Sequence, residues 1–153
     1  MRHGATDGGA ADPPEFKLGD CTTQRNLSEA GREQARRVGA RLKHEHVPIA
    51  QVFTSPWCRC RDTAMLAFGK AEEWDALAST FARPDIEAEL LDRVRKRIGN
   101  YSTRKSRAGN VVMVTHNVNI AGLTKLSVAP AEMVVVRPDG CCGLRVVARI
   151  APE

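Results

Sequence analysis

The sequence predicts an α/β fold in which a mostly parallel sheet is covered by helices on both faces. Amphipathic helical segments alternate with short apolar, β-branched segments through most of the 153 residues. The run "NVVMVTH" at 110–116 is apolar on both faces, as a buried strand of a parallel sheet is. Polar residues follow the ends of predicted strands, where open α/β sheets bind ligands. We therefore expect a three-layer sandwich formed by one domain over residues 1–153.

The first elements are a long loop and a helix. Residues 5–24 are rich in Gly, Asp, Pro and Thr without a hydrophobic period, and loops of this length inside a domain are usually functional. The segment 26–46 is an amphipathic helix for which Ser28 is a suitable N-cap. Its buried stripe consists of Ala35, Val38 and Leu42.

A strand and a second helix follow. "IAQVFTS" at 49–55 is short, apolar and β-branched, which predicts a buried strand that ends at Ser55-Pro56. The segment 58–69 then predicts a helix closed by Gly69. Residues 70–83 carry no clear pattern and are left without an assignment.

The second half of the chain repeats this alternation. Pro84 opens a predicted helix that extends to Tyr101, and its apolar residues recur at intervals of four. The remaining predicted elements are a polar loop at 104–109, the strand at 110–116, a helix at 117–126, strands at 133–136 and 143–150, and a turn "RPDG" at 137–140.

Composition narrows the class of protein. No apolar run approaches the roughly 18 residues of a membrane helix, so no membrane partner is expected. The net charge of +5 suits a small anionic substrate. The sequence also contains a basic stretch, which consists of Arg93, Arg95, Lys96, Arg97, Arg104, Lys105 and Arg107. We interpret this basic stretch as a solvated helix face and loop rather than a nucleic-acid site, because no nucleic-acid motif accompanies it.

The five cysteines do not form a zinc-binding pattern. We expect free buried thiols, and a bridge from Cys21 to Cys58 or Cys60 is the alternative if the protein is exported. The remaining two are the adjacent Cys141 and Cys142. His44 and His46 form a His-x-His pair without other ligands, so we expect no metal there.

Two histidines and two arginines occupy positions that favour phosphate chemistry. Arg2-His3 opens the chain, Arg59 follows one predicted strand in "SPWCRCRDTA", and His116 follows another. A neutral imidazole can attack phosphorus and form a phosphohistidine that water then hydrolyses. Arginine binds phosphoryl oxygens with two parallel N–H donors and stabilises the charge of the transition state.

These residues give the chain a resemblance to the histidine phosphatase superfamily, the group of phosphoglycerate mutase-like enzymes. The "RHG" motif matches residues 2–4 with Thr6 nearby, and "RNLSEAG" at 25–31 matches a second segment. The motif "S-P-x-x-R-x-x-x-T-A" matches 55–64, and His116 matches the second histidine. The resemblance covers nearly the whole chain. In its small size the chain resembles the phosphohistidine phosphatase branch of the family.

The resemblance implies a metal-independent phosphatase that needs no cofactor. His3 would be the nucleophile, Arg2 and Arg59 would clamp the phosphoryl group, and His116 would complete the pocket. Arg25 would be a further phosphate-binding residue or an anchor for the loop. The substrate would be a small phosphomonoester or phosphoramidate, or a phosphoprotein. Two alternatives are an inactive member that only binds a phosphorylated ligand and a mutase-type transferase, which the short chain disfavours.

The general acid of the family has no match in this sequence. The acidic residues of the relevant region sit in no recognisable motif, and Asp7 is one further candidate. The others are Glu72, Glu73, Asp85, Glu87 and Glu89. Once protonated, a phosphoramidate nitrogen leaves more easily than an alkoxide does. The lack of a recognisable general acid therefore favours a phosphoramidate substrate.

The resemblance also implies a central strand before "RHG", and only Met1 stands there. We expect either an N-terminally truncated domain or a degraded member, in which the nucleophile lacks a rigid base and neighbouring strands have unpaired edges. The expected cellular compartment also depends on whether sequence is missing before Met1. The localisation is left open: we expect a cytoplasmic protein from the chain as written and a periplasmic one if an upstream signal peptide has been lost. The oligomeric state cannot be derived from the sequence.

Overall fold

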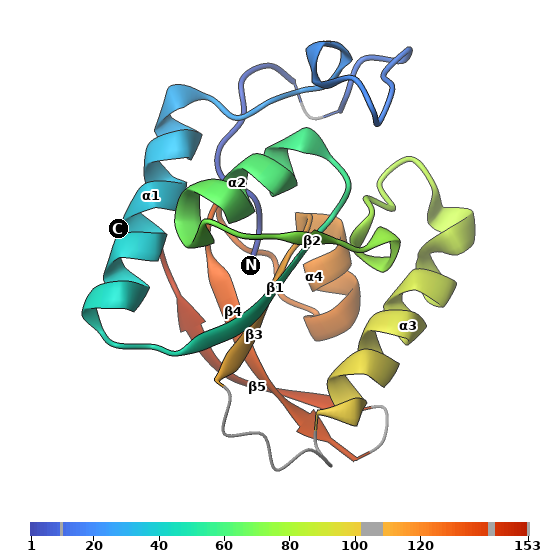
Figure 1. Cartoon of the computed structure of the whole chain (residues 1–153). Coiled ribbons are helices and arrows are strands. Elements are labelled where there is room, and N and C mark those ends of the chain that lie inside the picture. The colour runs from blue at the N-terminus through green and yellow to red at the C-terminus, as the bar shows by residue number, and fades with distance from the viewer. Residues whose placement is uncertain (10, 102–108, 141–142, 153) are drawn as a thin grey trace.

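The computed structural model describes residues 1–9, 11–101, 109–140 and 143–152 (Figure 1). Three parallel strands lie in the order β2-β1-β3, and an antiparallel hairpin pairs β4 with β5. The strands are β1 Ile49–Thr54, β2 Glu72–Glu73, β3 Asn110–Val114, β4 Met133–Asp139 and β5 Gly143–Ile150. The predicted α/β class with a parallel sheet flanked by helices is confirmed.

Within the described residues, four α-helices cover the strands (Figure 1). They are α1 Glu29–His44, α2 Cys58–Phe68, α3 Glu87–Asn100 and α4 Asn117–Thr124, and short 3-10 helices lie at Cys21–Thr23, Asp75–Leu77 and Pro84–Ile86. None of the helices within the described part of the chain is both long and apolar enough to span a membrane.

The core is divided between the two faces of the sheet. Val52 of β1 belongs to a hydrophobic cluster with residues of α1 and α2, whereas the next residue, Phe53, packs with residues of α3. Consecutive strand residues point to opposite faces, so this division places the two helix layers on opposite sides of β1. The three-layer arrangement follows from these contacts.

Local sequence signals explain where the first helices begin and end. The Ser28 hydroxyl accepts a hydrogen bond from the Gly31 N–H, so the predicted N-cap of α1 is confirmed. Ala35, Val38 and Leu42 are buried as predicted. Gly69 caps α2 in the left-handed conformation that glycine adopts without strain, with φ of 68°.

Two predicted boundaries are wrong. The helix predicted from Pro84 begins as a 3-10 turn, and α3 itself starts at Glu87. The turn predicted at 137–140 is strand up to Asp139, because β4 continues to pair with β5 through Pro138. Residues 70–83, which had no assignment, contain β2 and the 3-10 helix at Asp75–Leu77.

Residues 1–3 lie between the end of β3 and the chain just before β4. Arg2 forms a parallel bridge with Thr115, and the His3 N–H donates to the Thr115 carbonyl oxygen at 3.1 Å. On the other side, the Arg2 N–H donates to the Glu132 carbonyl oxygen and the Ala131 N–H to the His3 carbonyl oxygen, both at 3.0 Å. Backbone hydrogen bonds on both sides therefore hold His3, contrary to the expectation that it would lack a rigid base.

Candidate active site

His3 is a buried, neutral imidazole with one ring nitrogen engaged by the backbone. Its side chain is 4 % exposed, and its Nδ1 lies 2.8 Å from the carbonyl oxygen of Gly4. A carbonyl oxygen can only accept, so Nδ1 carries the proton and Nε2 keeps its lone pair. Burial is the main cause that lowers the pKa of His3 to about 3. The hydrogen bond to Gly4 opposes this shift, and the nearby charges of Arg59, Arg2 and Arg25 add to it.

His116 faces His3 at the N-terminus of α4. The two ring centroids are 5.4 Å apart in an edge-to-face arrangement. The Nδ1 atom of His116 lies 3.5 Å from Nη2 of Arg59, which can only donate, so the ring proton belongs to Nε2 and is donated to Ser55 Oγ at 2.9 Å. Burial, followed by the charge of Arg59, lowers the pKa of His116 well below its usual value. Both imidazoles are therefore neutral at pH 7.

The guanidinium group of Arg59 is buried and forms an ion pair with the carboxylate of Asp12. Nη1 of Arg59 donates to Asp12 Oδ1 at 2.7 Å, and Nη2 donates to Oδ2 at 3.1 Å. The Trp57 indole N–H donates to Oδ2 at 3.1 Å, and the Arg25 backbone N–H donates to Oδ1 at 3.0 Å. Burial raises the pKa of Asp12, but these hydrogen bonds outweigh it and hold that pKa below its usual value.

Arg2 and Arg25 complete a positively charged cluster around His3. Nη1 of Arg2 donates to the Val128 carbonyl oxygen at 2.6 Å, and Nη1 of Arg25 donates to the Gly9 carbonyl oxygen. Burial lowers the pKa of both guanidinium groups. Each of the arginines at positions 2, 25 and 59 has a buried Nε with no hydrogen-bond partner in the described structure. The cluster therefore has unused donors that suit an anion.

Glycine and threonine in the sequence motifs bring these segments together. The Gly4 N–H donates to Thr63 Oγ1 at 3.0 Å, which joins the segment carrying His3 to α2. A Cβ on Gly31 would lie 2.0 Å from the Ala5 carbonyl oxygen, so only glycine allows α1 to pack this closely against the chain after His3. A Cβ on Gly4 would lie 2.5 Å from the Gly31 carbonyl oxygen, so close packing explains both the glycine of "RHG" and that of "RNLSEAG".

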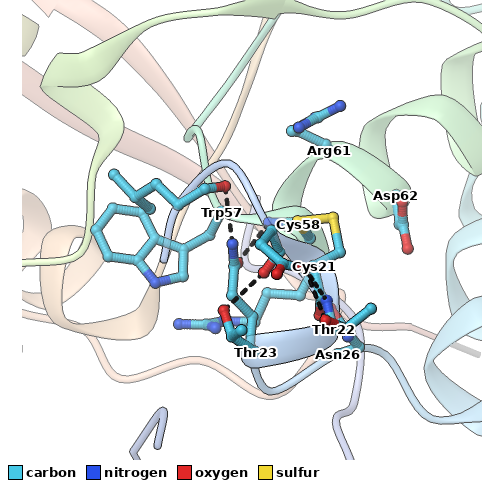
Figure 2. Close-up of a disulfide and its surroundings, with 12 residues drawn as sticks. Cys21, Thr22, Thr23, Asn26, Trp57, Cys58, Arg61 and Asp62 are labelled. Carbon is cyan, nitrogen blue, oxygen red and sulfur yellow. Dashed lines mark hydrogen bonds between the residues drawn. A yellow bond between two sulfur atoms is a disulfide. The ribbon is translucent and has the colours of Figure 1, made fainter. Parts of the chain in front are cut away.

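A disulfide ties the loop of residues 5–24 to the helix that carries Arg59. Cys21 and Cys58 are bonded, and the Gln24 side chain accepts a hydrogen bond from the Cys58 N–H at 3.0 Å (Figure 2). The expectation of free thiols is therefore wrong for these two cysteines, because the loop returns directly onto the start of α2. Cys60 is a free, buried thiol, and its pKa is raised to about 12 by burial. Cys141 and Cys142 lie outside the described residues.

The structure brings together all five residues predicted for the site. His3 and His116 are in ring contact, Arg59 contacts both His116 and the backbone of Arg25, and Arg2 is adjacent to His3 in the chain. Asp12, Ser55 and Trp57 were missed as members of this cluster. The length of the loop that carries Asp12 was the available signal, although the loop sequence does not show which side chain points inward.

The acidic candidates for a general acid make no hydrogen bond to a site residue within the described part of the chain. Glu73 forms an ion pair with Arg61 at 3.1 Å, and Asp85 forms one with Arg83 at 2.9 Å. Asp7, Glu72, Glu87 and Glu89 form no hydrogen bond to a site residue within the described structure.

The described part of the basic stretch makes local contacts. Arg93 pairs with Asp75 at 2.7 Å, and Lys96 pairs with Asp92 at 2.7 Å. The Arg97 guanidinium lies over the Phe53 ring. Arg104, Lys105 and Arg107, with most of the predicted polar loop at 104–109, lie outside the described residues.

Comparison with protein families gives a match over half of the chain. Residues 1–78 match the model of the histidine phosphatase superfamily (branch 1). No curated protein matches the sequence.

Solved structures share the fold over nearly the full chain. The protein histidine phosphatase SixA, solved with tungstate, is 19% identical with a TM-score of 0.64, and the match covers 99% of this chain and 94% of that one. The mycobacterial glucosyl-3-phosphoglycerate phosphatase Rv2419c is 18% identical, with a TM-score of 0.67 and coverages of 99% and 97%. TTHB049 from Thermus thermophilus is 19% identical, with a TM-score of 0.59 and coverages of 99% and 96%. At these identities the likeness is one of fold.

Proposed function

This chain belongs to the histidine phosphatase superfamily, and we propose that it is a phosphatase that works through a covalent phosphohistidine on His3. The observation that carries the proposal is the hydrogen bond between His3 Nδ1 and the Gly4 carbonyl oxygen, beside three guanidinium groups. It fixes the ring proton on Nδ1 and leaves Nε2 as an unprotonated nucleophile at neutral pH.

The charges of the cluster suit a phosphoryl group. Arg2, Arg25 and Arg59 bring three positive charges close to His3, and both imidazoles stay neutral. A phosphoryl group on these donors would present its phosphorus to His3 Nε2, while the guanidinium groups stabilise the charge on its non-bridging oxygens. His116, held by Ser55, would border the same oxygens.

The reaction would proceed in two displacements. In the first, His3 Nε2 forms a bond to phosphorus and the leaving group departs with the bonding electrons. In the second, water attacks phosphorus and the P–N bond electrons return to His3. The substrate class that fits this site is a phosphomonoester or phosphoramidate, carried by a small molecule or by a protein. The phosphatases among the structural neighbours support the class.

Hydrolysis of an aryl phosphate by the wild-type chain and by His3→Ala tests the proposal. An aryl phosphate has a good leaving group, so weak proton donation cannot hide the activity. His44→Ala is the matched control, because His44 is a histidine whose side chain is 86% exposed. We expect turnover in the wild type and the control, loss of at least a thousandfold in His3→Ala, and a base-stable, acid-labile phosphoprotein in the wild type.

Two results would contradict this proposal. Equal turnover in His3→Ala would place the chemistry elsewhere. A folded wild-type chain that binds inorganic phosphate, detected as a rise in Tm, without hydrolysing any ester would favour the inactive, ligand-binding alternative.

A further inference from the structure

The carboxylate of Asp12 is bound the way a substrate phosphoryl group would be. It accepts four hydrogen bonds, two from the forked Nη atoms of Arg59, one from the Trp57 indole and one from the Arg25 backbone. Only 11% of the Asp12 side chain is exposed, and the Arg59 side chain is 3% exposed. A phosphoryl group that uses both Nη atoms of Arg59 must therefore displace Asp12.

We propose that Asp12, displaced from Arg59 by the phosphoryl group, is the acid that protonates the leaving group. The inference rests on the proposed function and adds a residue to it. Among the described carboxylates, Asp12 is the one with hydrogen bonds to an arginine of the site.

The exchange itself turns an ionised carboxylate into a proton donor. With Arg59 as its partner, Asp12 is held in the charged form. Once the guanidinium has turned to the substrate, the carboxyl group has lost its positive partner and lies beside a phosphoryl dianion. Both changes favour the protonated form, as does burial, which already opposes ionisation here. The neutral donors of Trp57 and Arg25 do not compensate for the lost charge.

The carboxyl group and the nucleophile are carried by different segments, Asp12 by the loop and His3 by the chain that pairs with the end of β3. The loop that carries Asp12 is drawn in blue at the top of Figure 1, whereas the backbone of His3 is held by Thr115 just past the end of β3. An in-line displacement sends the leaving group to the side of phosphorus opposite the attacking nitrogen. The proposed acid role therefore requires the Asp12 carboxyl group to lie on the side of the phosphoryl group opposite His3.

The proton balance closes over the two displacements. As the P–O bond breaks, its electron pair stays on the leaving oxygen, which takes the proton of Asp12 while His3 Nε2 bonds to phosphorus. In the second step the Asp12 carboxylate takes a proton from the attacking water, and the P–N bond electrons return to His3. The sum is ester plus water giving alcohol plus phosphate, with Asp12 and His3 restored.

A comparison of leaving groups in Asp12→Asn tests the inference. An alkyl phosphate needs a proton on its leaving oxygen, whereas 2,4-dinitrophenyl phosphate does not. We expect kcat for the alkyl ester to fall at least a hundredfold, kcat for the dinitrophenyl ester to change less than about fivefold, and Asp12→Glu to restore part of the alkyl rate. Asp7→Asn, an exposed position in the same loop, is the matched control.

The outcomes separate this inference from the proposed function. An equal fall in kcat on both esters, or a rise on both, would overturn the acid role of Asp12. A rise on both would mean that Asp12 only competes with the substrate for Arg59. Trapping of phosphohistidine in Asp12→Asn with the dinitrophenyl ester shows that the variant is folded and that the nucleophile works. A wild-type chain inactive on both esters contradicts the proposed function and this inference with it, whereas wild-type activity with a uniform Asp12→Asn effect contradicts the inference alone.

Discussion

The disulfide between Cys21 and Cys58 should supply a large part of the stability of the fold. The two cysteines are 37 residues apart in sequence, and the loop that they close holds all of α1. In the chain-entropy account, a loop of this size stabilises the folded state by roughly 4 kcal/mol. That is a sizeable fraction of the 5–15 kcal/mol that is usual for a domain. For a chain of this length, it corresponds to a fall in Tm of roughly 8–16 °C on reduction.

Urea unfolding with and without dithiothreitol measures this contribution. The wild type should lose roughly 4 kcal/mol on reduction, and its m-value should rise because the reduced unfolded chain is less compact. Cys21→Ala is the matched control, since Cys21 is exposed and its loss leaves the packing of the core intact. This variant should unfold like the reduced wild type and should not respond to the reductant. A wild type that loses less than about 1 kcal/mol would refute the reasoning.

Two other predictions concern packing and charge at the site. Gly31→Ala places a Cβ 2.0 Å from the Ala5 carbonyl oxygen and should cost about 1–3 kcal/mol in denaturant unfolding. In Gly9→Ala the added Cβ meets no atom within 4 Å, so stability should change by less than about 0.5 kcal/mol, and equal effects of the two changes would contradict the close approach. His3 has a pKa of about 3 when folded and about 6.5 when unfolded, so the unfolded chain binds more protons between these values and stability falls as pH falls. Between pH 6 and pH 5, the free energy of unfolding measured by urea titration should change less with pH in His3→Gln than in the wild type, by about 1 kcal/mol per pH unit. The same pH dependence in both proteins would mean that His3 is not buried as a neutral ring.

The fold could be predicted because its signals are local. Ser28 and Gly69 mark helix ends through their own hydrogen bonds and backbone angles, and the apolar periods of the helices mark their buried faces. The turn predicted at 137–140 was wrong for the opposite reason. Pro138 and Asp139 favour a turn locally, but pairing with Leu144 and Gly143 of the neighbouring strand extends β4 through them.

The site could be predicted where its residues follow strands or match the family motifs. His116 sits just past β3, and Arg59 sits in the first turn of the helix after β1, so the topology alone brings them to one edge of the sheet. Asp12 is separated from Arg59 by 47 residues and belongs to a loop without periodicity. The partner of Cys21 posed the same difficulty, because a loop sequence does not record the path by which it returns to the fold.

The charges and unpaired donors of Arg2, Arg25 and Arg59 are explained by binding of an anion and not by the stability of the fold. Arg59 is buried with one carboxylate partner, while Arg2 and Arg25 bond only to carbonyl oxygens and hold buried Nε donors without partners in the described structure. Unpaired buried donors and neighbouring like charges cost stability, so packing alone does not explain them. An anion with several oxygens would satisfy these donors and compensate the excess charge. Asp12 supplies two such oxygens to Arg59, and a phosphoryl group supplies more, which gives the substrate its advantage over the residue that it replaces.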